Sequence, residues 1–155
     1  HGDLFNLLQA IVNRCFGWPN LRVGTTTTRI RVDAVTVAIA DQLYSVAAQD
    51  NVQVTGLTNT TASQTRKVRV EVTTAGVLTF KEGAAAAAQV NAPMPRRTAT
   101  RATLGWIEIP VSFTYGTTAF SAPGVTFTNG DPDLGDGVGV PPNDRGISQD
   151  IITSP

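Results

Sequence analysis

The sequence predicts a mainly β fold: an antiparallel β-sandwich or jelly-roll-like domain with a short N-terminal helix and an extended C-terminal tail. The 155 residues contain only two Lys and three Glu, which favour helices, whereas Thr, Ala, Val and Gly are abundant. Short stretches of alternating apolar and polar residues follow one another between Thr25 and Thr128 without intervening helical patterns. We therefore expect a helix or arm at 1–18, a β-sandwich domain at 19–128, and an acidic Pro/Gly-rich arm at 129–155.

Residues 3–17 have the pattern of an amphipathic helix. Asp3 is a suitable N-cap, and Gly17 followed by Trp18-Pro19 is a stop signal. One apolar stripe follows helical spacing and consists of Leu4, Leu8, Ile11 and Cys15. The helix either caps the open end of its own β-domain or forms an oligomer seam or a docking helix for a larger partner. In each case we expect its apolar face, including Cys15, to be buried.

The alternating segments predict a series of short strands. Segments 30–32 and 35–39 alternate in opposite phase, so a turn or a bulge is expected at Asp33-Ala34. A further turn is expected at Asp41-Gln42. Other strand segments are expected at 43–45, 52–54, 104–113 (with Pro110 marking an edge or a bulge) and 125–128.

The clearest predicted hairpin joins residues 67–72 to residues 77–80 through a turn at 73–76. Val68, Val70 and Val72 share one face of the first strand, while Lys67, Arg69 and Glu71 occupy the other. Alternation of this kind predicts a half-buried strand with its charged face in solvent.

The charges of the chain are separated along the sequence. Residues 129–155 contain five Asp against one Arg, giving minus four, and the preceding 128 residues contain eleven Lys and Arg against seven Asp and Glu, giving plus four. The C-terminal arm is therefore expected to lie across basic positions such as Arg96, Arg97 and Arg101, on its own chain or on a neighbour. The alternative is a solvated tail.

Several kinds of chemistry are disfavoured by composition. One Cys and one His provide neither an internal disulfide nor a Cys/His catalytic or zinc site. The acidic run that begins at Asp131 has Pro142, not Glu, at the twelfth position of a calcium loop. Zero net charge argues against nucleic acid, and no apolar run reaches the length of a transmembrane helix. We expect no enzyme activity, cofactor, metal, nucleic-acid or membrane partner, or small-molecule substrate.

Part of the chain resembles a recurring module of small virion proteins of tailed bacteriophages, the head-decoration (cement) and head-fibre type. The segments that carry the resemblance lie between Val35 and Thr128, namely 42–52, 67–80, 104–109, 113–121 and 124–126. The chain departs from that pattern at Asp41-Gln42, where Asn-Gly or Asp-Gly would be expected, and in its N-terminal helix and acidic tail. The resemblance implies a β-sandwich that clasps capsid subunits as a dimer or trimer and has no catalytic site.

The expected function is thus that of a capsid decoration protein on the virion surface, which binds and stabilises the shell of major capsid protein and forms a homo-oligomer. The alternative is a tail, adaptor or receptor-binding module, with Trp106 or Tyr115 exposed toward a glycan or a protein. A β-sandwich hydrolase is disfavoured by the near absence of His. The candidate interface residues are Leu4, Leu8, Ile11, Arg96, Arg97, Trp106, Asp131, Asp133 and Asp136.

Overall fold

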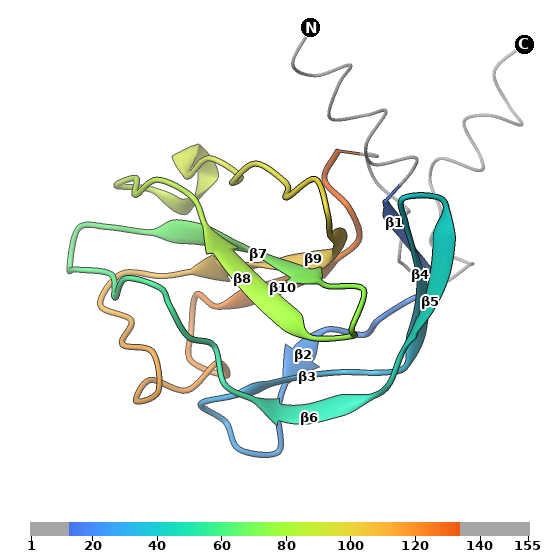
Figure 1. Ribbon diagram of the computed structural model, residues 1–155. Coiled ribbons are helices and arrows are strands. Elements are labelled where there is room, and N and C mark those ends of the chain that lie inside the picture. The colour runs from blue at the N-terminus through green and yellow to red at the C-terminus, as the bar shows by residue number, and fades with distance from the viewer. Residues whose placement is uncertain (1–12, 134–155) are drawn as a thin grey trace, which may run out of the picture.

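Two β-sheets make up the part of the chain that this computed structural model describes, residues 13–133 (Figure 1). The only helical element among these residues is one short 3-10 turn, η1 (Gln89–Asn91), between β8 and β9. The mainly β class expected from the sequence is confirmed for this part of the chain. The strands are β1 (Arg14–Phe16), β2 (Arg22–Val23), β3 (Ile30–Val32), β4 (Val35–Ile39), β5 (Gln42–Val46), β6 (Gln49–Val52), β7 (Arg66–Val72), β8 (Leu78–Glu82), β9 (Ala102–Ile109) and β10 (Thr126–Asn129).

The larger sheet has the strand order β5-β4-β1-β9-β7-β8. One edge of β9 pairs with β7. The other edge of β9 is shared by β1 and β10. The contact between Arg14 of β1 and Thr103 of β9 is parallel, while the other strand pairs in this sheet are antiparallel. The sheet is therefore mixed and curled (Figure 1). The sequence-based prediction of a purely antiparallel sheet is wrong in this respect. The smaller sheet, β2-β3-β6, is antiparallel.

The hydrophobic core lies between the two sheets. Val68, Val70 and Val72 of β7 are fully buried, and Ile30 and Val32 of β3 meet the same cluster from the smaller sheet. Each such side chain contributes about 1.5–3 kcal/mol through burial. One part of the core is aromatic, with ring centroids 5.1–6.5 Å apart among Phe113, Tyr115, Phe120 and Phe127.

The predicted hairpin over residues 67–80 is confirmed. β7 and β8 pair antiparallel, with Val72 opposite Leu78. The turn closes when Gly76 N–H donates to the carbonyl of Thr73 at 2.9 Å, and Gly76 has a φ of 78°, a conformation that glycine adopts without steric strain.

The phase change predicted at Asp33-Ala34 marks the point where the chain passes from one sheet to the other. β3 belongs to the smaller sheet and β4 to the larger. The N–H of Asp33 donates to the carbonyl of Pro19 at 2.7 Å, which holds this corner against the segment before β2. β3 and β4 have opposite phases because they lie in different sheets, and each strand turns its apolar residues toward the same core.

The prediction of a helix over residues 3–17 is wrong for the last part of that range, because Arg14–Phe16 form β1. Cys15 is buried as predicted, but as a strand residue opposite Val37. Gly17, with a φ of 95°, follows the end of the strand. Three residues cannot distinguish helical from strand periodicity, and the partner strands come from distant parts of the sequence. Residues 3–12, with Leu4, Leu8 and Ile11, lie outside the described residues.

Candidate functional site

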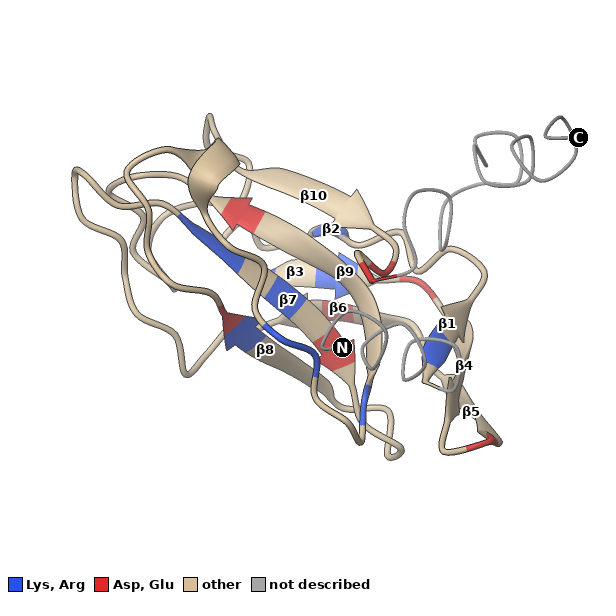
Figure 2. Ribbon diagram, turned by 90° about the horizontal axis from the view of Figure 1, so that it is seen from above, with Lys and Arg blue, Asp and Glu red and all other residues tan. Residues whose placement is uncertain are grey.

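The outer face of β7 carries charged residues that the chain itself covers (Figure 2). Arg69 and Glu71 point away from the valine core, yet their residues are only 1% and 0% exposed. The prediction that this face lies in solvent is therefore wrong at these two positions. The covering groups come from the loop before β9, which includes Pro95, Arg97 and Thr98, and from the residues that follow β10.

Two arginines and two aspartates form a buried charge cluster, defined here as Arg69, Arg97, Asp131 and Asp133. Arg69 Nη1 lies 3.6 Å from Asp131 Oδ1 and 3.4 Å from Asp133 Oδ2. Arg97 Nη2 lies 3.0 Å from Asp131 Oδ2, and its Nη1 lies 3.6 Å from Asp133 Oδ2. The Asp131 side chain is 1% exposed, so little water screens its pairs with the two arginines, whereas the Asp133 side chain is 20% exposed. The two positive and two negative side chains balance one another.

Hydrogen bonds fix the arginines of the buried charge cluster in place. Arg69 Nε donates to the carbonyl of Pro95 at 2.9 Å, and its Nη1 donates to Thr103 Oγ1 at 2.9 Å. The N–H of Asp133 donates to Asp131 Oδ1 at 3.0 Å, which closes a turn at residues 131–133. Arg69 thus connects β7, β9 and the covering loop through one side chain.

Arg97 connects the two ends of the described chain. Its Nη2 donates to the carbonyl of Asn13 at 2.7 Å while lying 3.0 Å from Asp131. The Asn13 amide in turn donates to the carbonyl of Ala99 and accepts from the N–H of Ala40 at 2.8 Å. Residues 13 and 131 are therefore held at one place on the sheet, although they are far apart in the sequence.

Glu71 has a separate role beside the buried charge cluster. Its Oε2 accepts from the N–H of Thr98 at 2.7 Å, and its Oε1 accepts from Thr98 Oγ1 at 2.8 Å. Both carboxylate oxygens are therefore occupied by the covering loop. Glu71 therefore fastens that loop to β7.

Burial shifts the pKa values of three groups at this site. It raises the pKa of the Asp131 carboxyl above its ordinary value, against the opposing effect of the Arg97 guanidinium. It lowers the pKa of Arg69, an effect that Asp133 and Asp131 oppose. Burial and, secondarily, the charge of Asp131 raise the pKa of Cys15 to about 12. The Cys15 thiol is therefore protonated at neutral pH and behaves as a core residue.

The structure separates the basic residues that the sequence grouped together. Arg97 is buried and meets Asp131 and Asp133, so part of the predicted contact between acidic and basic segments is made within one chain. Arg96 is exposed, and Asp136 lies outside the described residues. Sequence reasoning placed Arg69 and Glu71 on a solvent-facing strand face and did not single out Asn13, so it missed that all three are buried. No local signal marks them, because the groups that bury them lie more than 20 residues away.

The aromatic candidates have different surroundings. Trp106 is half-buried on β9, directly across from Arg69 on β7. Tyr115 is half-buried, with its ring centroid 5.2 Å from that of Phe113 and its hydroxyl buried. Trp18 is 42% exposed and is therefore more accessible than Trp106 and Tyr115.

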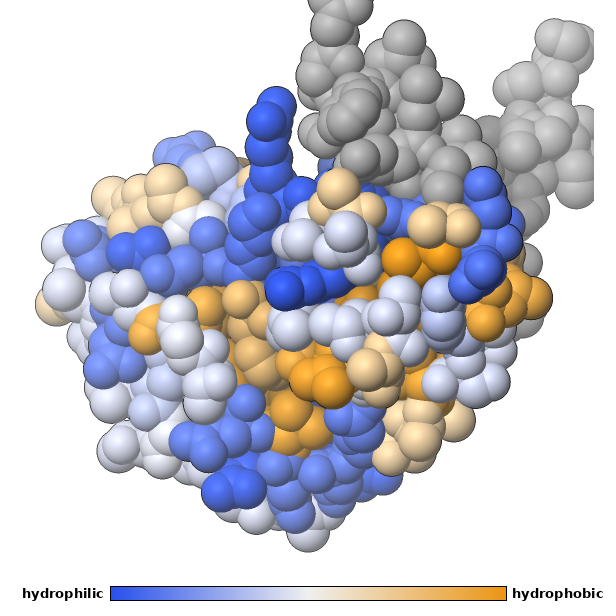
Figure 3. Space-filling model, viewed as in Figure 1, coloured by the Kyte–Doolittle hydropathy of each residue, from blue (hydrophilic) through white to orange (hydrophobic). Residues whose placement is uncertain are grey.

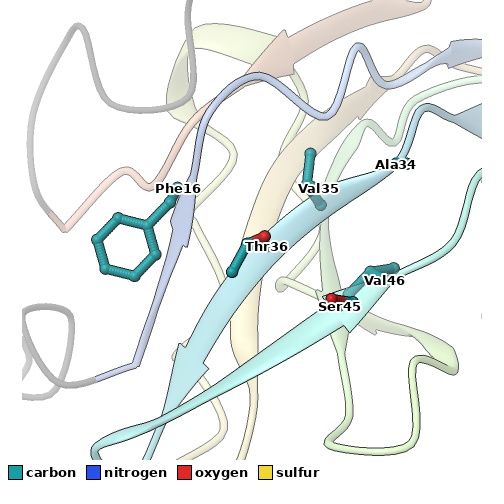
Figure 4. A pocket seen from close by; sticks show the side chains of 6 residues that line it. All are labelled: Phe16, Ala34, Val35, Thr36, Ser45 and Val46. Atoms are coloured by element: carbon teal, nitrogen blue, oxygen red, sulfur yellow. The ribbon is translucent and has the colours of Figure 1, made fainter.

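A second candidate region lies on the outer face of β1, β4 and β5, where apolar side chains remain at the surface (Figure 3). Leu43 is 70% exposed and Phe16 is 39% exposed. A shallow hollow of about 380 Å³ lies beside them (Figure 4), lined by Phe16, Ala34, Val35, Thr36, Ser45 and Val46. We call the outer face of these three strands, with this hollow, the open face.

Within residues 13–133, no three metal-ligating side chains are grouped together. No helix in the same range has the length and hydrophobicity to cross a membrane. Comparison with protein families, with curated proteins and with solved structures finds no match to this chain.

Proposed function

We propose that this chain is a structural protein of a tailed-bacteriophage virion, of the capsid decoration (cement) type, located on the capsid surface. The resemblance of segments between Val35 and Thr128 to small virion proteins supports this proposal. In it, the two packed sheets act as a rigid β-sandwich, and the chain ends act as arms that bind the major capsid protein. Arms let a small protein contact more surface than its compact body can.

The observation that supports this function best is the pair of contacts made by Arg97. Asn13 directly follows residues 1–12, and Asp133 directly precedes residues 134–155. Arg97 holds Asn13 and Asp131 at one place on the sheet, at 2.7 and 3.0 Å. Two arms that start from one fixed point can engage the same partner surface, and a fixed start reduces the orientational freedom lost on binding.

The charge distribution supports contact between copies in a homo-oligomer. The chain has a net charge of zero, but its acidic residues concentrate after Asn129. Asp131 and Asp133 are neutralised internally by Arg69 and Arg97, while Arg96 stays exposed. Exposed basic positions on one copy are therefore available to the remaining acidic residues of another.

The proposal is tested by adding the purified chain to phage shells that lack it. We expect co-sedimentation and a higher disruption temperature of the shells. Leu8→Asp, which places a charge in the N-terminal arm, should weaken binding about tenfold or more. Val90→Asp is the matched control, because Val90 is an apolar side chain 84% exposed on η1. Absence of binding by the unaltered chain, with shells of unchanged heat resistance, would overturn the proposal.

A tail, adaptor or receptor-binding module is the second candidate, and the exposed Trp18 is the observation that favours it. Indole rings bind both glycans and protein partners at exposed sites. The two aromatic residues first expected in this role, Trp106 and Tyr115, are only partly accessible. Immunogold labelling of intact virions separates the candidates, since a decoration protein labels the head and an adaptor or receptor-binding module labels the tail.

A further inference from the structure

The outer edge of β5 has no hydrogen-bonded neighbour among residues 13–133, because β4 is the only described strand that pairs with it. Backbone N–H and C=O groups on such an edge can pair with another strand. Five residues make up β5, and none of them is charged or proline: Gln42, Leu43, Tyr44, Ser45 and Val46. Charged side chains and proline are the usual means by which proteins block pairing at a sheet edge.

The edges of other strands are covered or carry charge. On β8, Glu82 accepts two hydrogen bonds from Thr58, at 2.9 Å each, so a loop lies against that strand. At β10, the Asn129 side chain accepts from the N–H of Leu21 at 2.6 Å. β6 carries Asp50 in its short span. Among residues 13–133, the edge of β5 is neutral, has no covering strand and carries one exposed apolar side chain, Leu43. β10 is also neutral, but none of its large apolar side chains is exposed.

The register of the strands places two rows of side chains across the open face. One row consists of Phe16, Thr36 and Ser45, and the other of Arg14, Ala38 and Leu43. The first row lines the shallow hollow (Figure 4). The second row ends at the edge with Leu43, which is 70% exposed. A strand added to β5 would continue both rows.

We propose that a second copy of this chain pairs with β5, edge to edge and antiparallel, about a twofold axis at Tyr44. In this register Leu43 of each copy lies opposite Ser45 of the other. Leu43 of one copy then continues the row of Phe16, Thr36 and Ser45 beside the hollow of the other copy. The twofold axis repeats this contact with the two copies exchanged. Because β5 is neutral, the two copies meet without like-charge repulsion.

This inference deepens the homo-oligomer of the proposed function and rests on that part of it. A five-residue edge with one apolar side chain per copy is smaller than a standard interface of about 800 Å² per partner. The dimer is therefore expected to dissociate on dilution, and its population to depend on concentration.

The first test is analytical ultracentrifugation of the full chain over a concentration series. The unaltered chain should pass from monomer to dimer, and Leu43→Lys should raise the dissociation constant about tenfold or more. Val90→Lys is the matched control, because Val90 is 84% exposed and lies on η1 rather than β5. A monomer at every concentration, or equal behaviour of the two variants, would overturn the inference.

The second test determines the register by disulfide formation. Directly opposed residues in antiparallel strands have Cα atoms about 4.5–5.5 Å apart, within disulfide range. A mixture of Leu43→Cys and Ser45→Cys chains should therefore form a disulfide-linked heterodimer under mild oxidation. Each variant alone should not, because like positions lie about 8 Å or more apart in this register, beyond disulfide range. The native Cys15 is buried and supplies no accessible thiol.

The outcomes separate this inference from the virion function. A β5-linked dimer that does not bind shells supports the inference and overturns the capsid function. Shell binding by a chain that stays monomeric overturns the inference alone. Cross-linking by Leu43→Cys without a Ser45→Cys partner overturns the proposed register.

Discussion

Two parts of the large sheet present opposite outer faces. Over β7, the outward residues Arg69 and Glu71 are charged and nearly completely buried. Over β4 and β5, the outward Leu43 and the neighbouring Phe16 are apolar and exposed. The charged face is closed because the loop before β9 and the residues after β10 bring polar and charged partners to Arg69 and Glu71. The open face has no such cover among residues 13–133.

The largest expected effect comes from breaking the buried charge cluster at Arg97. Arg97→Met leaves the Asn13 carbonyl without the Arg97 donor, and leaves Arg69, 3.6 Å away, as the remaining cation beside the buried Asp131. Removing one partner of a buried pair lowers the free energy of unfolding by about 3–5 kcal/mol. Urea denaturation measures this change. The exposed neighbour is the control, since Arg96→Met should change the free energy by about 0.5 kcal/mol or less. Equal losses in the two variants would contradict the assignment.

The next effect tests how the covering loop is fastened to β7. Glu71→Leu removes both acceptors of Thr98, whose N–H and hydroxyl donate at 2.7 and 2.8 Å. Loss of the partners of partly buried donors should lower the free energy of unfolding by about 1–3 kcal/mol. Glu108→Leu on β9 is a control in the same sheet, with an expected change near 0.5 kcal/mol. If urea denaturation gave the same loss for both, Glu71 would have no special role.

A smaller effect is expected at the corner between the two sheets. Hydrogen bonds from Arg22 and then Asn20 lower the pKa of Asp33 below its ordinary 3.8. The folded state therefore gains stability from ionised Asp33 above pH 3.8, and loses it as the pH falls through the lowered pKa. Both side chains are partly exposed, so Asp33→Asn should lower stability by about 1 kcal/mol or less at neutral pH. The difference from the unaltered chain should vanish in strong acid. An NMR titration that gives Asp33 a pKa at or above 3.8 would contradict this prediction.

The smallest effect is expected on the open face. Leu43→Ser, measured at a concentration where the chain is monomeric, should change the free energy of unfolding by about 0.5 kcal/mol or less, because Leu43 is 70% exposed. A loss comparable to that of Arg97→Met would show that the chain itself covers Leu43. The contrast between the two faces would then disappear.

Local pattern was sufficient for some elements and insufficient for others. The hairpin of β7 and β8 follows from alternation and a glycine turn within one stretch of sequence. β1 was missed because its three residues are a strand only through pairing with Ala38 and Thr103. The charged face of β7 was correctly separated from its valine face, but its burial depends on Pro95, Thr98 and Asp131. Such groups are brought together only when the chain folds.

The sequence by itself determined the β-rich class, the valine core face of β7, the burial of Cys15, and the separation of charge between the body and the acidic C-terminal end. These features depend on composition and on side chains close together in the chain. Tertiary structure decided that Arg97 joins Asn13 to Asp131, that Glu71 is buried, and that β5 has only β4 as a neighbouring strand within residues 13–133. The physical reason is that burial and pairing depend on distances between segments, and those distances exist only in the folded chain.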